Sequence, residues 1–145
     1  WDLIDKETNT MDDYKKTVQD KLSFMLYSPV VFISALTGQR VTKLYEMIKF
    51  VADQAAQRIS TGMLNDVLNE AVAMVQPPSD KGKRLKLYYM TQIKVKPPTF
   101  AVFVNRADLA HFSYMRYIEN RIRQNFGFEG TPIVLKKKKK DSKDV

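Results

Sequence analysis

The sequence contains no cysteine and a single histidine, His111. The absence of cysteine excludes disulfide bonds and thiolate metal sites, and it is consistent with the reducing cytoplasm, which is the location that we expect. His111 has no plausible catalytic-triad or metal partners in the sequence. We therefore interpret it as structural, and we predict neither a catalytic residue nor a metal site.

Long apolar runs are also missing. No stretch of about 18 apolar residues occurs and nothing resembles a secretory signal, so we expect neither a membrane span nor a signal peptide. The phosphate-binding motif G-x-x-x-x-G-K-[ST] is absent as well, because the nearest string, Gly82-Lys83-Arg84, has Pro77 where the first glycine should stand. We therefore expect that these 145 residues alone do not hydrolyse a nucleotide.

Positive charge is concentrated in the second part of the chain. The formal net charge is +8. Residues 1–57 contain seven Lys and Arg against eight Asp and Glu, a net of −1, whereas residues 58–145 contain 17 against eight, a net of +9. A basic unit joined to a neutral one is typical of a polyanion-binding module attached to a partner with a different task.

The first 57 residues have the pattern of a helix, a strand and a second helix. Residues 10–26 show apolar side chains at helical spacing after a capping box of Thr10 and Asp13. Val30–Ile33 is apolar without alternation, as in a strand that is covered on both faces of a parallel sheet. Helical spacing returns over residues 40–57. We expect the last helix-strand-helix of a doubly wound domain, and hence a piece of a longer protein.

Residues 58–135 predict a second unit with the order α-β-β-(short helix)-α-β. Ser60 or Thr61 is a candidate N-cap for its first helix, which Pro77 stops. We expect three strands backed by helices on one face, with strands over residues 85–95, 100–104 and 131–135 and a long helix over 113–126. Residues 136–145 begin with five lysines and are expected to form a basic flexible tail.

One loop of the first unit carries a specific chemical signal. The apolar strand runs into Ser34-Ala35-Leu36, and Asp2 stands upstream. In guanine-nucleotide-binding domains, the aspartate of an Asn-Lys-x-Asp element accepts two guanine protons, because a carboxylate matches two parallel donors, and the alanine N–H of Ser-Ala-x meets O6. Asp2, Ser34, Ala35 and Leu36 are our candidates for such a base pocket. An ordinary αβα segment with a turn gives the same string.

Several longer strings occur along the chain in a fixed order. They are Trp1-Asp2, Phe32–Gly38, Leu64–Leu68, Val95–Phe100, Phe103–Asn105, Tyr117–Arg123 and Phe126–Pro132. In these strings, which cover nearly the whole chain, the sequence resembles the C-terminal part of the bacterial tandem GTPases of the EngA (Der) family.

The resemblance implies an α/β fold in which residues 1–57 are the helix-strand-helix remnant of a P-loop GTPase domain and residues 58–135 form a KH-like α+β domain. It implies a parent that binds GTP or GDP with Mg and hydrolyses GTP, whereas we expect no cofactor in these residues alone. It also implies a cytoplasmic role in assembly of the large ribosomal subunit. The implied partners are that subunit, its ribosomal RNA and the parent's N-terminal GTPase domain, whose nucleotide state would cover or free the basic face.

KH domains usually clamp nucleic-acid backbone with a G-x-x-G loop between two helices. The string Gly127-Phe128-Glu129-Gly130 has that spacing, but it lies between a helix and a strand and carries a negative charge. We reject it as a clamp. The topologically correct place, Asn105–Ala110, has no glycine pair, so RNA contact must depend on side chains.

Cationic side chains that could meet phosphates occur in a loop, around the long helix and in the lysine run. They are Lys81, Lys83, Arg84, Arg106, Arg116, Arg121, Arg123, Lys136, Lys137, Lys138, Lys139 and Lys140. The alternative is that the arginine stems cover apolar surface and the lysines are merely solvated. Tyr88, Tyr89 and Tyr114 could stack on bases, although aromatic residues at such spacings more often pack in a core or at its rim.

Two functions of different classes follow. The first is an RNA-binding and interdomain regulatory module of a ribosome-assembly GTPase, with an affinity that falls steeply with salt. The second is a protein-interaction domain whose basic face docks on a neighbouring GTPase domain without touching RNA. A weaker third possibility, a membrane-surface anchor formed by the lysine run, has no amphipathic basic helix or lipidation site to support it.

Overall fold

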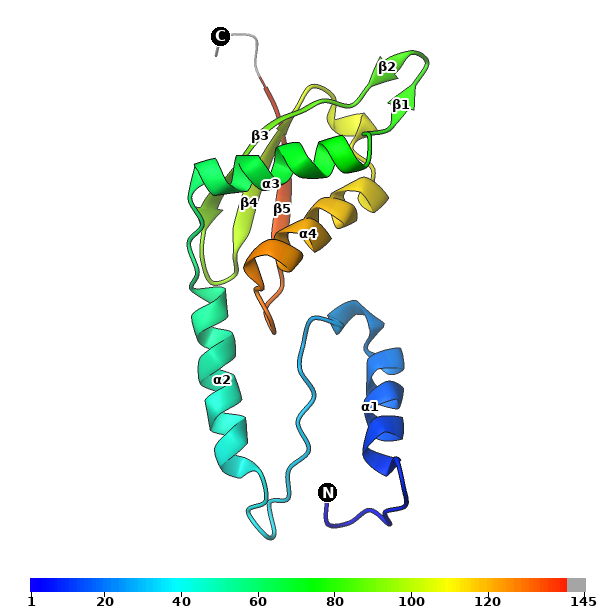
Figure 1. Cartoon of the computed structure of the whole chain (residues 1–145), viewed down its shortest axis with the longest axis vertical. Helices are drawn as coiled ribbons and strands as arrows, with labels where there is room; N and C mark the ends of the chain where they lie inside the picture. The colour runs from blue at the N-terminus through cyan, green and yellow to red at the C-terminus, as the bar shows by residue number, and fades with distance from the viewer. Residues whose placement is uncertain (141–145) are drawn as a thin grey trace.

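The computed structural model describes residues 1–140 and divides into two differently built parts (Figure 1). The first contains two helices and an extended segment, and the second contains a three-stranded sheet with helices on one side. In chain order the elements are α1 (Thr10–Lys21), η1 (Ser23–Met25), α2 (Val41–Ala55), α3 (Thr61–Met74), β1 (Ser79–Asp80), β2 (Lys83–Arg84), β3 (Leu87–Lys94), β4 (Thr99–Val104), η2 (Ala107–Leu109), α4 (Phe112–Phe126) and β5 (Val134–Lys139).

The first part differs from the sequence prediction in two ways. The expected helix over residues 10–26 ends at Lys21, because Leu22 leaves helical geometry (φ −112°, ψ 44°) and a short 3-10 turn follows. The expected strand Val30–Ile33 is extended but is not part of any sheet within residues 1–140, since no other strand lies beside it to exchange backbone hydrogen bonds.

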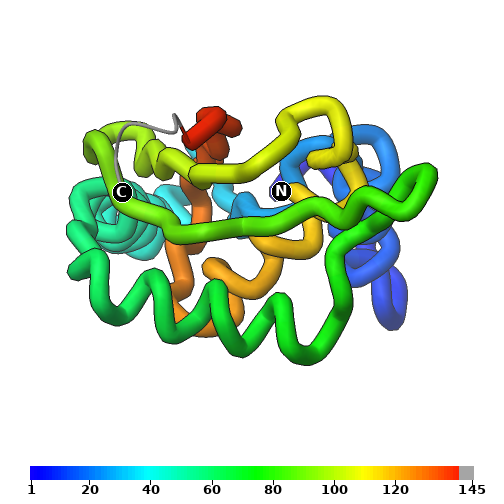
Figure 2. Tube along the Cα trace, turned by 90° about the horizontal axis from the view of Figure 1, so that it is seen from above, coloured from blue at the N-terminus to red at the C-terminus, as the bar shows by residue number. Residues whose placement is uncertain are grey.

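The second part has the predicted α-β-β-(short helix)-α-β order. Its sheet has the order β3-β4-β5, with β3 and β4 antiparallel and β4 and β5 parallel. Figure 2 shows α3 and α4 on the same side of this sheet, so no helix of residues 1–140 covers the opposite face, which is called the bare face below. The first helix begins as predicted, because the Ser60 hydroxyl accepts a 3.3 Å hydrogen bond from the Met63 N–H.

The hydrophobic core lies between the sheet and these two helices. The strands contribute Met90, Phe100 and Val102, and α4 contributes Ile118 and Ile122, all of them at most 1% exposed. Alternate residues of a strand point to opposite faces. The helix-covered face of β3 therefore carries Met90, which pairs in register with Val102.

One side chain of α3 closes the outer edge of β3. The Asn65 side chain accepts a 2.9 Å hydrogen bond from the Met90 N–H and donates a 3.2 Å bond to the Met90 carbonyl. These are the groups with which a further strand would pair. A helix residue thus takes the place of a neighbouring strand.

Two features of the second part were not predicted. A small hairpin, β1 and β2, forms within the polar loop after α3. The last strand was expected to end at Leu135 and to be followed by a tail, but β5 continues to Lys139 in register with β4. The prediction was wrong here because backbone pairing continues while the charged side chains reach solvent. Residues 141–145 of the expected tail lie outside the described part.

No helix within residues 1–140 is long and apolar enough to cross a bilayer.

Candidate nucleotide-base loop and nucleic-acid interface

The fold brings Asp2 and Ser34 together across 32 positions of sequence. The Ser34 hydroxyl donates a hydrogen bond to Asp2 Oδ1, and the amino group of Trp1 donates to the Ile33 carbonyl at 2.9 Å. The Trp1 ring packs on Phe32, with centroids 4.8 Å apart. These contacts fix the start of the chain against the extended segment, just before the loop.

The loop leaves two predicted base-contact groups accessible. Ala35 and Leu36 are exposed, and the Ala35 N–H has no hydrogen-bond partner within the described residues. The hydrogen bond from Ser34 lowers the pKa of Asp2, so its carboxylate is ionised and accepts hydrogen bonds at neutral pH. An accepting carboxylate beside a free backbone donor fits the edge of a guanine base. Guanine recognition at this loop remains a prediction.

Arg123 joins the two parts of the molecule. Its guanidinium donates to the carbonyls of Phe128 (2.8 Å) and Thr131 (3.0 Å) and lies 4.5 Å from the ring centre of Tyr27. Burial lowers the pKa of Arg123, while Glu119, 3.7 Å away, acts in the opposite direction. This guanidinium has protein partners on several sides, which makes it the least available of the predicted phosphate contacts.

The Gly127–Gly130 loop packs against the first part of the chain. The Gly130 N–H donates to the Tyr27 carbonyl at 2.8 Å, and a Cβ placed on Gly130 would lie 2.4 Å from Val51 Cγ2 of α2. The Glu129 N–H points to Gln54 Oε1 at 3.4 Å. Protein therefore occupies the place that a nucleic-acid backbone would need, which agrees with rejection of this string as a clamp.

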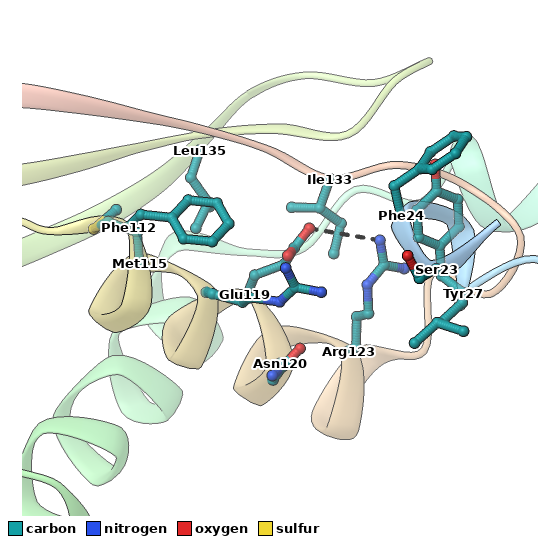
Figure 3. A pocket seen from close by; sticks show the side chains of 12 residues that line it. Ser23, Phe24, Tyr27, Phe112, Met115, Glu119, Asn120, Arg123, Ile133 and Leu135 are labelled. Atoms are coloured by element: carbon teal, nitrogen blue, oxygen red, sulfur yellow. Dashed lines mark ion pairs between the residues drawn. The ribbon is translucent and has the colours of Figure 1, made fainter. Parts of the chain in front are cut away.

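A cleft of about 660 Å³ lies between η1 and the face formed by α4 and β5 (Figure 3). Figure 3 shows Arg123 between Glu119, with which it forms an ion pair, and the rings of Phe24 and Tyr27. Phe24 and Phe112, which both line the cleft, are 70% and 75% exposed. The cleft thus combines open aromatic surface with cationic groups.

The predicted RNA-contact residues fall into two groups. Arg106 and Arg121 form ion pairs, with Asp108 at 2.7 Å and with Glu70 at 3.0 Å. Hydrogen bonding from Arg106 lowers the pKa of Asp108. Among the predicted contacts, the exposed cations with neither an ion pair nor a side-chain hydrogen bond in the described part of the chain are Lys81, Lys83, Arg84, Arg116, Lys136, Lys138 and Lys139. These seven side chains are the most open of the predicted contacts to a polyanion, and Lys140 is half-buried.

The segment at the topological place of a KH clamp, Asn105–Ala110, is contacted by a lysine of β5. Within Asn105–Ala110 the chain forms η2, and the Lys137 amine donates to the Ala110 carbonyl at 2.9 Å. His111 is the exposed residue before α4 and has no side-chain capping bond. No group of three or more His, Cys, Asp or Glu side chains within residues 1–140 has the arrangement of a metal site.

The three candidate tyrosines differ in exposure. Tyr114 is 7% exposed and donates a 2.8 Å hydrogen bond to the Val75 carbonyl, so it is a core residue. Tyr88 is 44% exposed, and the Lys140 amine lies 5.1 Å from its ring centre. Tyr89 stacks on Phe103. The sequence analysis did not single out Phe103. Alternation along its strand and along the lysine run could have indicated that Phe103 and alternate lysines lie on the same face of the sheet.

Comparison with known proteins identifies the family. Residues 58–138 match the family described as KH-domain-like of EngA bacterial GTPase enzymes, C-terminal. The chain is 73% identical over 133 residues to GTPase Der of Ruminiclostridium cellulolyticum, covering 92% of this chain and 30% of the relative. It is 66% identical over 143 residues to GTPase Der of Acetivibrio thermocellus, covering 97% and 32%. The chain thus spans about a third of the length of these relatives. It belongs to the EngA (Der) family of bacterial GTPases, and it contains the family's C-terminal KH-domain-like region.

Proposed function

We propose that this chain is the RNA-binding and interdomain regulatory region of a GTP-hydrolysing protein that acts in assembly of the large ribosomal subunit in the cytoplasm. The single observation that carries the proposal is the group of seven exposed cations named above, Lys81, Lys83, Arg84, Arg116, Lys136, Lys138 and Lys139. Its members lie on the β1–β2 hairpin, α4 and β5. Phosphate contacts by Lys and Arg supply most of the affinity in non-specific RNA binding.

The base loop supports a GTP-binding parent. Asp2, Ser34, Ala35 and Leu36 would hold the guanine base, because an ionised carboxylate and a free N–H are the groups that its edge requires. GTP bound with Mg would supply a phosphoanhydride bond for hydrolysis. The motif that cradles phosphates and Mg is not in this sequence, so the chain itself should neither bind nucleotide measurably nor turn it over.

The test is the salt dependence of RNA binding by the chain of residues 1–145. Affinity for a ribosomal RNA segment is measured by filter binding between about 50 and 200 mM salt. If several phosphates are contacted, affinity falls by about a hundredfold or more over this range. A nearly constant affinity, or no binding at low salt, would refute the electrostatic mechanism.

A protein-docking function is the second candidate, and the exposed aromatic residues of the cleft favour it. Phe24 and Phe112 are exposed rings at opposite ends of the cleft (Figure 3), and Arg116 lies beside Phe112. Such exposed apolar surface suits a protein partner better than a phosphate backbone. In this case the N-terminal GTPase domain of the same parent would cover the region. Crosslinking from a probe at residue 112 within the whole parent protein, compared with crosslinking to RNA, distinguishes the two.

A further inference from the structure

The bare face of the sheet carries a row of alternating lysines. Along β5, Leu135 packs against the core and Lys137 donates to Ala110 on the helix side. Because successive strand residues point to opposite faces, Lys136 and Lys138 lie on the bare face. Lys140 continues the series, since its N–H donates to the Val104 carbonyl at 3.1 Å and its amine lies over Tyr88.

Aromatic rings stand beside these lysines on the same face. Tyr89 and Phe103 are register partners, and their rings are stacked with centroids 4.2 Å apart and planes at 14°. Phe103 is in turn the register partner of Lys138. A row of tyrosine, phenylalanine and lysine therefore crosses all three strands, on the face opposite Met90 and Val102.

The three strands that form this face carry charge of one sign. Strands β3, β4 and β5 have the sequences LYYMTQIK, TFAVFV and VLKKKK, which contain no Asp or Glu. A face of cations and aromatic rings without carboxylates is complementary to a polyanion that also offers flat, unpaired rings. Single-stranded RNA has both properties, whereas a duplex keeps its bases stacked inside.

Lysines on an edge strand have another explanation, because they discourage pairing with a second sheet. That role requires only charge along the strand, so lysines on either of its faces would serve it equally. A cross-strand aromatic pair likewise stabilises a sheet by itself. Neither explanation requires the aromatic residues and the alternate lysines to share one face.

We propose that the aromatic–lysine face, formed by Tyr89, Phe103, Lys136, Lys138 and Lys140, binds unpaired RNA. Tyr88 stands at its edge, next to Lys140. The rings contact bases, and the three amines contact the phosphates between them. This inference rests on the proposed RNA-binding function and adds the surface and the strandedness of the ligand. It places the contact on the sheet, away from the loop region where the glycine pair is missing.

The chain offers a matched control on the same strand. K136Q/K138Q and K137Q/K139Q each remove two positive charges from β5, but from opposite faces. Binding to a labelled twelve-nucleotide oligouridine is measured by fluorescence anisotropy with the chain of residues 1–145, and circular dichroism checks that each variant is folded. We expect K136Q/K138Q to weaken binding about tenfold or more and to reduce the salt slope by about 1.4, since each single-strand phosphate contact contributes about 0.7. K137Q/K139Q should weaken it less than about threefold.

The aromatic part is tested separately with F103L, which keeps an apolar side chain in the sheet. We expect about a tenfold loss for oligouridine and little change for a twelve-base-pair RNA duplex. Equal losses in the two lysine variants, an unchanged F103L, or equal affinity for duplex and single strand would each overturn the proposal. In these cases salt-sensitive RNA binding would still support the proposed function. Absence of RNA binding by the unmodified chain would overturn both.

Discussion

The two parts of this molecule differ most in what they bury. Within residues 1–57 the one buried residue is the polar Ser34, and apolar side chains of α2 such as Tyr45 and Ile48 are 68% and 57% exposed. All the buried hydrophobic residues of the described chain lie at Leu64 or beyond. The first part therefore has helices and a loop without a core, while the second has a core of its own.

The difference shows where stability and chemistry reside. Burial of apolar surface is the main favourable contribution to folding, so the second part should determine the stability of the whole chain. The first part contributes the base loop, whose form depends on a few hydrogen bonds such as the one from Ser34 to Asp2. Four predictions test or sharpen this contrast.

The largest effect is expected in the core of the second part. Phe100→Ala removes a fully buried ring that packs edge-on against Phe128, and it should lower the free energy of unfolding by about 3–5 kcal/mol. Ile48→Ala on exposed α2 should change it by less than about 0.5 kcal/mol. Urea unfolding measures both. Similar losses from the two variants would mean that the first part has a core of its own.

The junction between the two parts is tested with Gly130→Ala. Gly130 has a φ of +78°, and its new Cβ would meet Val51, so we expect a loss of about 2–4 kcal/mol. Gly82→Ala is the control, because Gly82 has a φ of +76° with nothing within 4 Å and should lose only about 1 kcal/mol from backbone strain. Equal losses in thermal unfolding would show that contact with α2 contributes nothing.

A pH effect should also come from the second part. Burial raises the pKa of Tyr114 to about 12 from an ordinary value of 10.0. A pKa raised by folding means that the stabilisation is fully present below about pH 10 and is lost as the pH rises through about 12. Tyr114→Phe should remove this part of the alkaline decline, as seen in unfolding free energies at several pH values. An unchanged alkaline decline would show that other groups cause it.

The smallest effect is expected at the surface. Glu70→Gln breaks the 3.0 Å ion pair with Arg121, and because Glu70 is largely exposed the cost should be no more than about 1 kcal/mol. Glu46→Gln on α2, where no ion pair occurs in the described residues, is the matched control. A loss well above that value for Glu70→Gln would show that the pair is effectively buried.

Much of the second part could be predicted because its signals are local. Ser60 before an apolar helical stripe predicted the start of α3, and the strand patterns over residues 85–95 and 100–104 predicted β3 and β4. The end of β5 could not be predicted. Its extension through Lys139 depends on pairing with β4 about 35 residues earlier, and a run of lysines contains no local signal for such pairing.

The sequence indicated which residue types form the candidate site, but it indicated the contacts between them only in part. The sequence assigned Asp2 and Ser34 to one base pocket, and in the structure a hydrogen bond joins them, while their role in base recognition stays a prediction. Arg116 and Arg123 looked equivalent in sequence, but only Arg123 meets the carbonyls of the following loop and the ring of Tyr27. Tertiary packing decides which arginine is structural and which is available to a ligand. Helical spacing in the sequence does not reveal this difference.

The hydrogen bonds of Asn65 with the backbone of Met90 give the sheet a direction of growth. A strand supplied by another molecule finds the backbone groups of Met90 in β3 already paired. Beside β5, four consecutive lysines would meet its side chains. Any such addition would therefore be selective, favouring acidic peptides and repelling further copies of the same basic strand.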